Sequence, residues 1–114
     1  MSRSQGKFKI NKKDIIRNKN EIKDLFLNGN RFIYSNLTII YKPDGEPGVG
    51  FFASKKLKGA VKRNRVKRIL REAYRMNKEV FMGFKVIFYA QSLLDAEEVL
   101  KAFQAFKKGV RNGK

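Results

Sequence analysis

The residues best suited to chemistry in this sequence are cationic, and they are concentrated in one segment. Residues 54–78 contain eleven lysines and arginines against a single acid, Glu72. Guanidinium groups bind phosphate through two parallel N–H donors, and lysine ammonium groups add point charges. The segment therefore predicts binding to a phosphate-rich partner rather than acid–base catalysis.

The spacing of these cations follows the period of an α-helix. We predict a helix over about residues 60–77, with Val66 and Leu70 on its apolar face. On the opposite face polar donors recur at i, i+3, i+4, i+7 and i+11. The members of this cationic stripe are Asn64, Lys67, Arg68, Arg71 and Arg75. A solvated helix usually intersperses acids for pairing four residues apart, so a stripe that lacks them indicates an anionic ligand.

Composition narrows the possible functions further. The 114 residues carry 27 Lys+Arg against 10 Asp+Glu, and the formal net charge of +17 predicts a polyanionic partner. The sequence has no Cys and no His, which excludes disulfides, thiolate nucleophiles, a histidine base and the usual zinc sites. The acids are scattered over predicted turns and helix starts, so no two-metal nuclease site is expected.

The same composition predicts where the protein acts. No apolar run approaches the roughly 20 residues that span a bilayer, and the basic N-terminus is followed by no apolar stretch of the kind found in a secretory signal. The lack of cysteine fits a reducing compartment. We therefore expect a cytoplasmic protein with no membrane partner.

The rest of the chain predicts the elements that position the cationic helix. Asn18, with Glu21 three residues on, indicates the start of a short first helix, and Asn28-Gly29 ends it through the left-handed conformation that glycine tolerates. Asp95 and Glu98 form a capping box for a last helix. Strands are expected at about residues 32–34, 37–41, 49–54 and 84–90.

These elements define a fold class. The order α-β-β-β-α-β-α predicts one α+β domain over residues 1–114, a sandwich of helices packed on a mostly antiparallel sheet. A flexible basic arm at about residues 1–12 and a frayed basic tail at about residues 108–114 are expected at its ends.

Two adjacent stretches carry a resemblance to a known family. Residues 49–56 read Val-Gly-Phe-Phe-Ala-Ser-Lys-Lys, and the predicted helix has an Arg-Asn-Arg core at 63–65 followed by Arg68 and Arg71. In this signature the chain resembles the bacterial ribonuclease P protein subunit, and the resemblance extends over most of its length. The family usually has Gly-Asn where this sequence has Lys58-Gly59.

The resemblance implies a function and an unusual topology. Members of the family pair with a large catalytic RNA and remove the 5′ leaders of precursor tRNAs. The RNA carries the chemistry and requires Mg²⁺, so no catalytic residue, bound metal or cofactor is expected in the protein, nor is a protein partner, and a monomer is expected. The family fold has a left-handed βαβ crossover, against the usual handedness. A ribosomal or other structured-RNA-binding protein without a processing role is the alternative, because its electrostatics would look the same.

The resemblance also implies two sets of site residues. Contacts with the RNA subunit are expected from Lys56, Arg63, Asn64, Arg65, Lys67, Arg68, Arg71 and Arg75. A cleft between the first helix and the sheet is expected to stack the single-stranded leader, with the candidates Phe8, Phe26, Tyr34, Ile40, Tyr41 and Phe52. Two aromatic positions of the family cleft are Ile22 and Ile40 here. Either the cleft stacks fewer bases than in the family, or Tyr34 and Tyr41 take the place of the missing aromatic side chains.

Overall fold

The computed structural model describes residues 14–46 and 48–111, and within them the elements follow the predicted order. The helices are α2 (Lys19–Asn28), α3 (Ala60–Met76) and α4 (Ala96–Phe106). A 3-10 turn, η2 (Lys78–Phe81), follows α3, and a π-helical turn, η3 (Lys107–Arg111), continues α4. The strands are β1 (Asn30–Tyr34), β2 (Leu37–Pro43), β3 (Gly48–Ala53) and β4 (Phe84–Ala90). The predicted basic arm and the last residues of the predicted tail lie outside the described residues.

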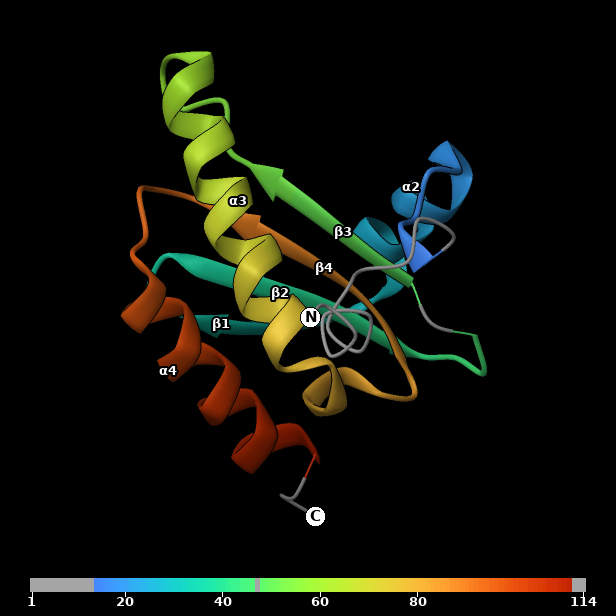
Figure 1. Cartoon of the computed structure of the whole chain (residues 1–114). Helices are drawn as coiled ribbons and strands as arrows, with labels where there is room; N and C mark the ends of the chain where they lie inside the picture. The colour runs from blue at the N-terminus through green and yellow to red at the C-terminus, as the bar shows by residue number, and fades with distance from the viewer. Residues whose placement is uncertain (1–13, 47, 112–114) are drawn as a thin grey trace, which may run out of the picture.

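The four strands form one mixed sheet in the order β1-β2-β4-β3. The β1–β2 and β2–β4 pairs are antiparallel, whereas β3 and β4 are parallel and α3 connects them. In Figure 1, β3 and β4 point to the upper left with α3 in front, and the chain passes from β3 to β4 in the left-handed sense. The crossover implied by the family resemblance is therefore present, against the usual preference for right-handed connections.

Helices cover both faces of the sheet (Figure 1). The larger core lies between the sheet and the helices α3 and α4, and it includes the fully buried Phe88, Phe103 and Phe106. A smaller core lies under α2, where Leu25 packs with Ile40. Because side chains alternate along a strand, each central strand supplies residues to both cores.

The helix starts confirm the predicted caps at α2 and α4. The Asn18 side chain accepts hydrogen bonds from the backbone N–H of Asn20 at 2.8 Å and of Glu21 at 3.3 Å. Asp95 and Glu98 form the reciprocal capping box. At the start of α3 no side chain caps the helix, and Gly59 has a φ of +93°, a left-handed conformation that favours glycine. A glycine at position 59 is thus what this turn requires.

Gly29 ends α2 for a different reason from the one predicted. Its φ is −73°, so the left-handed conformation expected from the sequence is wrong. A Cβ at this position would lie 2.6 Å from the carbonyl oxygen of Leu25 and 2.8 Å from Cγ2 of Ile40. Glycine is needed because the end of α2 approaches its own last turn and the sheet too closely for a side chain.

This close approach predicts the effect of adding one methyl group. Gly29→Ala is expected to lower the free energy of unfolding by about 1–3 kcal/mol, the usual range for overpacking. Gly45→Ala is the matched control, because a Cβ there meets no atom within 4 Å. Urea unfolding followed by circular dichroism measures both variants, and equal midpoints would contradict the explanation.

Candidate nucleic-acid interface

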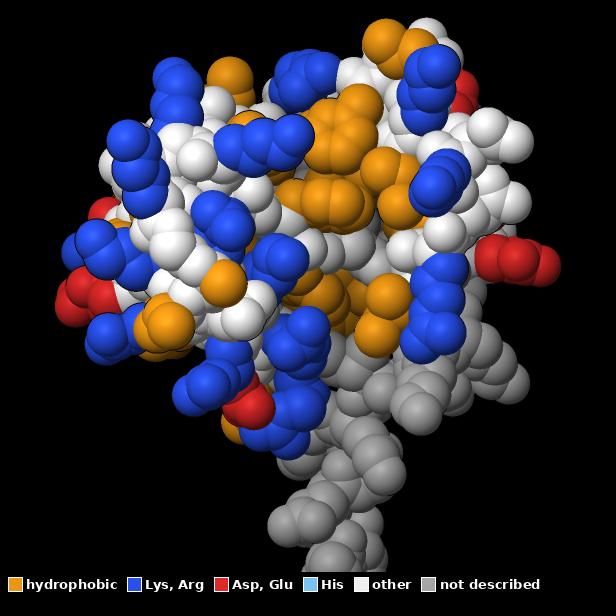
Figure 2. Space-filling view, turned by 90° about the horizontal axis from the view of Figure 1, so that it is seen from above, with side chains coloured by type: hydrophobic (Ala, Val, Ile, Leu, Met, Phe, Trp, Pro, Cys, Tyr) orange, Lys and Arg blue, Asp and Glu red, His pale blue; other side chains and the backbone are white. Residues whose placement is uncertain are grey.

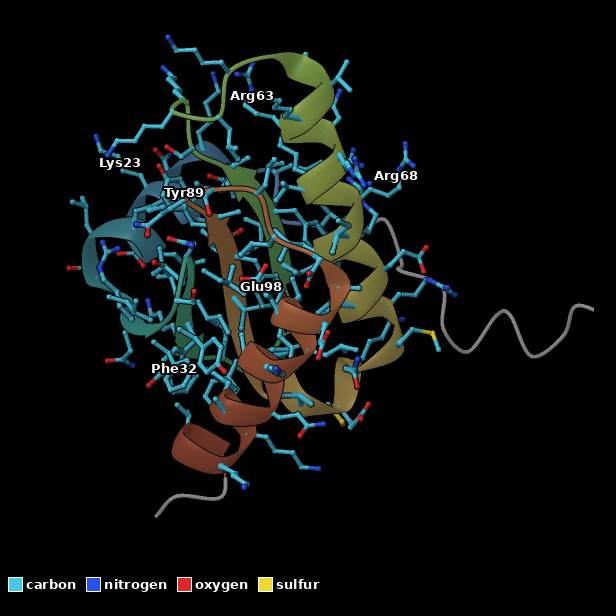
Figure 3. The ribbon with its side chains drawn as sticks, turned by 90° about the vertical axis from the view of Figure 1, so that its left-hand side faces the viewer. Lys23, Phe32, Arg63, Arg68, Tyr89 and Glu98 are labelled. Atoms are coloured by element: carbon cyan, nitrogen blue, oxygen red, sulfur yellow. The ribbon has the colours of Figure 1, made fainter. Side chains whose placement is uncertain are left out.

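The cationic stripe predicted from the sequence lies on the outer face of α3. Val66 and Leu70 are fully buried against the sheet, whereas Asn64, Arg68 and Arg71 are exposed. Figure 3 shows Arg68 extending from α3 away from the rest of the molecule. The helix is therefore held by one face and presents the other to a partner.

The charges of this stripe are largely uncompensated. Arg75 pairs with Glu72 at 2.7 Å, near the C-terminal end of α3. Across the part of the chain that the structure describes, Lys67, Arg68 and Arg71 form no ion pair. Like charges this close on one helix repel one another, so an external anion bound to them lowers the electrostatic energy of the helix.

The loop before α3 brings further cations to the same end of the molecule. The Arg63 guanidinium donates to the carbonyl oxygen of Leu57 at 2.8 Å, and the backbone N–H of Lys56 donates to the Ser54 hydroxyl at 3.1 Å. Arg63 is half-buried and fixes the loop, while Lys56 and Arg65 are exposed. The first turn of α3 has no acid and no side-chain cap, so its partial positive charge adds to these cations.

A row of side chains crosses the opposite face of the sheet, beside α2. The strand register aligns Ile33 of β1, Thr38 of β2, Tyr89 of β4 and Phe52 of β3. Phe26 of α2 meets Phe52 and Tyr89 edge to face, with ring centroids 5.7 and 6.1 Å apart. These three half-buried rings form the aromatic cluster, and Ile33, which is 67% exposed, extends its apolar surface to the edge of the sheet.

The structure corrects part of the predicted leader cleft. Tyr34 and Tyr41 both pack into the core under α3 and α4, and the Tyr41 ring lies 5.1 Å from that of Phe106. Neither tyrosine lines a cleft under α2, because the alternation of the strands turns both to the other face. Ile40 does face α2 but is fully buried beneath it. Phe8 lies outside the described residues.

Tyr89 is the member of the aromatic cluster that the sequence prediction missed. Phe88, its neighbour in β4, is fully buried in the core under α3 and α4. Tyr89 follows Phe88 in β4 and so points to the opposite face of the sheet, the face under α2 to which Ile87 also belongs. The alternation of side chains along residues 84–90 is the sequence signal that places Tyr89 on the face opposite Phe88.

The cationic stripe and the aromatic cluster meet across the edge strand β3. Consecutive residues of a strand point to opposite faces, so Phe51 turns towards α3 and Phe52 towards α2. Phe51 is half-buried, with the Arg71 guanidinium 5.5 Å from its ring centroid. Figure 2 shows hydrophobic side chains in a hollow with lysines and arginines on both sides.

Ion pairs hold α2 over the sheet. Lys85 of β4 pairs with Glu21 of α2 at 2.5 Å and with Asp44 at 3.7 Å, and Lys42 pairs with Asp24 at 3.0 Å. The hydrogen bond to Glu21 raises the pKa of Lys85. Hydrogen bonds from the side chains of Asn28 and, next, Lys42 lower the pKa of Asp24. A hydrogen bond from the backbone N–H of Glu46 lowers the pKa of Asp44. These ion pairs tie α2, and with it Phe26, to β2 and β4.

The described residues offer no metal site and no membrane span. No three of their acids lie together in a way that could hold a metal ion, so no chemical step is assigned to a metal on this part of the protein. None of their helices combines the length and apolarity needed to cross a membrane.

Solved structures share this fold. An RNase P protein from Staphylococcus aureus superposes with a TM-score of 0.71 at 20% identity, covering 83% of this chain and 93% of that one. The RNase P protein from Thermotoga maritima gives a TM-score of 0.61 at 24% identity, covering 85% and 91% of the two chains.

Sequence relatives carry the same name. The ribonuclease P protein component of Petrotoga mobilis is 38% identical over 80 residues, 68% of each protein. That of Porphyromonas gingivalis is 37% identical over 79 residues, which are 64% of this chain and 58% of the relative, less than two thirds of its length. The family model described as Ribonuclease P matches residues 10–112. The chain belongs to the ribonuclease P protein family.

The ion pairs under α2 predict a dependence of stability on pH. The contribution of Asp24 and Asp44 is present above their ordinary pKa near 3.8 and is lost as the pH falls through their lower folded values. The contribution of Lys85 is present below its ordinary pKa of 10.5 and is lost as the pH rises through its higher folded value. The free energy of unfolding is therefore expected to be largest between these limits and to fall in acid.

Urea unfolding at pH 7 and pH 3 tests this expectation. Lys85→Met is expected to reduce stability at pH 7 and to lose less on acidification than the unaltered protein does. Lys101→Met is the control, because its 3.6 Å pair with Glu97 lies on the exposed surface of α4. An unchanged stability of Lys85→Met at pH 7 would show that the Lys85 pairs do not hold α2.

Proposed function

We propose that this chain is the protein subunit of bacterial ribonuclease P. In this proposal it binds the catalytic RNA and the 5′ leader of precursor tRNA, and so assists the removal of the leader. The observation that carries the proposal is the cationic stripe of α3, in which Lys67, Arg68 and Arg71 form no ion pair within the described residues. The family membership and the shared fold support it.

The stripe is suited to a folded RNA. A helix that is packed by one face presents its side chains at fixed spacings, so its arginines and lysines can follow a phosphate backbone. Neutralising phosphates releases counterions, which makes the affinity strongly dependent on salt. In this role Lys56, Arg65, Lys67, Arg68 and Arg71 bind the RNA, Asn64 adds an amide donor, and Arg63 and Arg75 contribute charge while holding local structure.

The aromatic cluster is suited to the leader. Single-stranded RNA binds where rings offer stacking surfaces beside a cationic path. Phe26, Phe52 and Tyr89 provide the rings. Lys23 and Arg63 lie at the same end of the molecule as Tyr89 (Figure 3). Since only the precursor has a leader, contacts made here favour precursor over mature tRNA.

The chemistry of cleavage is assigned to the RNA in this proposal. The RNA-containing holoenzyme requires Mg²⁺, which would activate water and stabilise the developing charge on phosphate. The residues of this chain bind and orient, and none is proposed as catalytic. We further propose that one copy acts per RNA in the cytoplasm, a setting that suits a sequence without cysteine.

Reconstitution tests the proposed function. The pure protein is added to a bacterial ribonuclease P RNA at low Mg²⁺, and cleavage of a precursor tRNA is followed. Cleavage is expected with both components, and none with the protein alone. Tight binding to the RNA without stimulated cleavage would instead favour the ribosomal or general RNA-binding alternative.

Arg68→Ala is expected to weaken binding to the RNA subunit by about 1.5–3 kcal/mol, the cost of a lost hydrogen bond to a charged group. The slope of log affinity against log salt is expected to fall by about 1. Arg68 is exposed, so the fold should be retained in circular dichroism. Lys108→Ala, which removes an exposed cation from η3, is the control, and equal losses in both variants would mean that net charge rather than the stripe binds RNA.

Tyr89→Ala is expected to lower affinity for precursor tRNA by roughly 1–3 kcal/mol, the cost of one stacked base, and to leave affinity for mature tRNA unchanged. Binding is measured on the reconstituted holoenzyme. Tyr34→Ala is the matched control, a half-buried tyrosine on the other face of the sheet. A precursor preference that survives in Tyr89→Ala, or is lost in both variants, would exclude the aromatic cluster as the leader site.

A further inference from the structure

An apolar groove lies between α3 and α4. Its volume is about 680 Å³, within the usual size range of ligand pockets. Its lining residues are Arg68, Ile69, Glu72, Ala73, Met76 and Asn77 of α3 and the turn after it, and Ala96, Leu100 and Gln104 of α4. Met76 is 51% and Leu100 is 42% exposed, so large apolar side chains face solvent here.

The groove follows from how α4 packs. Val99, Phe103 and Phe106 bury one face of the helix against the sheet. The residues that line the groove recur every four positions on an adjacent face, from Ala96 to Gln104. Neither the sheet nor α3 covers this second apolar face, so it is available to a ligand.

The ion pairs at the groove leave Arg68 as the charged side chain of its lining that can bind an anion. Glu72 is already paired with Arg75 at 2.7 Å, and Glu97, on the next position of α4, is paired with Lys101 at 3.6 Å. Arg68 lines the groove and forms no ion pair within the described residues. The groove thus combines apolar walls with one uncompensated guanidinium, and a ligand that matches it has a flat apolar body next to an anion.

A nucleotide has this combination of groups. Its phosphate fits the guanidinium, its base fits between aliphatic walls, and the exposed Gln104 amide can both donate to and accept from a base edge. Arg68 belongs at once to the groove and to the cationic stripe. An RNA whose backbone follows the stripe therefore passes the mouth of the groove, which favours a nucleotide of that RNA over a separate peptide.

We propose that the groove between α3 and α4 receives an unpaired base of the RNA that is bound along α3, with Arg68 on its phosphate and Leu100 and Ile69 against its ring. This inference rests on the proposed function, because it takes the cationic stripe to hold a structured RNA. It adds a base-binding site on the side of the stripe remote from the aromatic cluster.

The test uses the full chain with a bacterial ribonuclease P RNA and two readouts, affinity and chemical probing of each nucleotide. Leu100→Gln keeps a helix-forming side chain of similar length but removes the apolar wall. We expect a loss of affinity of about 5- to 20-fold, in the lower part of the range for one stacked base. We also expect one or a few unpaired bases, protected by the unaltered protein, to become reactive again. Leu27→Gln, an exposed leucine on α2, is the control and should change neither readout.

Each outcome distinguishes the inference from the proposed function. If the unaltered protein does not bind the RNA, the proposed function fails. If it binds, and Leu100→Gln retains both the affinity and the protections, the proposed function stands and the base site is excluded. If Leu100→Gln lowers the affinity but makes no base newly reactive, the base site is also excluded. Gln104→Ala, at an exposed position, gives the same readouts should Leu100→Gln be unstable, and it is expected to restore reactivity at the same bases.

Discussion

The alternation of side chains along the edge strand β3 organises the whole interface. Phe51 and Phe52 are neighbours in sequence, but one points towards α3 and the other towards α2. The parallel pairing of β3 with β4 fixes this direction, because Phe51 is opposite Phe88 and Phe52 is opposite Tyr89. If β3 paired with β4 one residue out of register, Phe51 would turn towards α2 and Phe52 towards α3. The cationic stripe and the aromatic cluster thus depend on a single strand pairing for their relative position.

The sequence was sufficient to predict the elements and the stripe, because both rest on local periodicity. Leu70 and Arg71 are adjacent, and the 100° step of a helix alone separates the buried side chain from the exposed one. The caps at Asn18 and Asp95 were predictable for a similar reason, since capping depends on side chains within three residues of the helix start.

The features that the sequence did not predict are those that depend on contacts between distant elements. Tyr89 faces α2, whereas Tyr34 and Tyr41 face the other side of the sheet. This depends on the alternation within each strand and on how the strands are aligned with one another, and the alignment is set only in the assembled sheet. The reason for Gly29 lies partly in Ile40, eleven positions later in the chain. Lys85 and Glu21 are 64 residues apart, and no short-range pattern relates them. The left-handed crossover is not a consequence of spacing at all and was expected only from the family.

The few acids of the chain are distributed unevenly, and this has a consequence for encounter with a polyanion. Glu21, Asp24 and Asp44 surround Lys42 and Lys85 where β4 begins, and they neutralise that end of the sheet. Lys55, Lys56 and Lys58, which follow β3 at its other end, form no ion pair within the described residues. The charges of the described residues consequently form an electric dipole along the strands, and the field of an approaching nucleic acid exerts a torque on it that turns the cationic end forward before any contact forms. Beyond roughly one Debye length, about 8–10 Å at physiological salt, this orienting torque is largely screened.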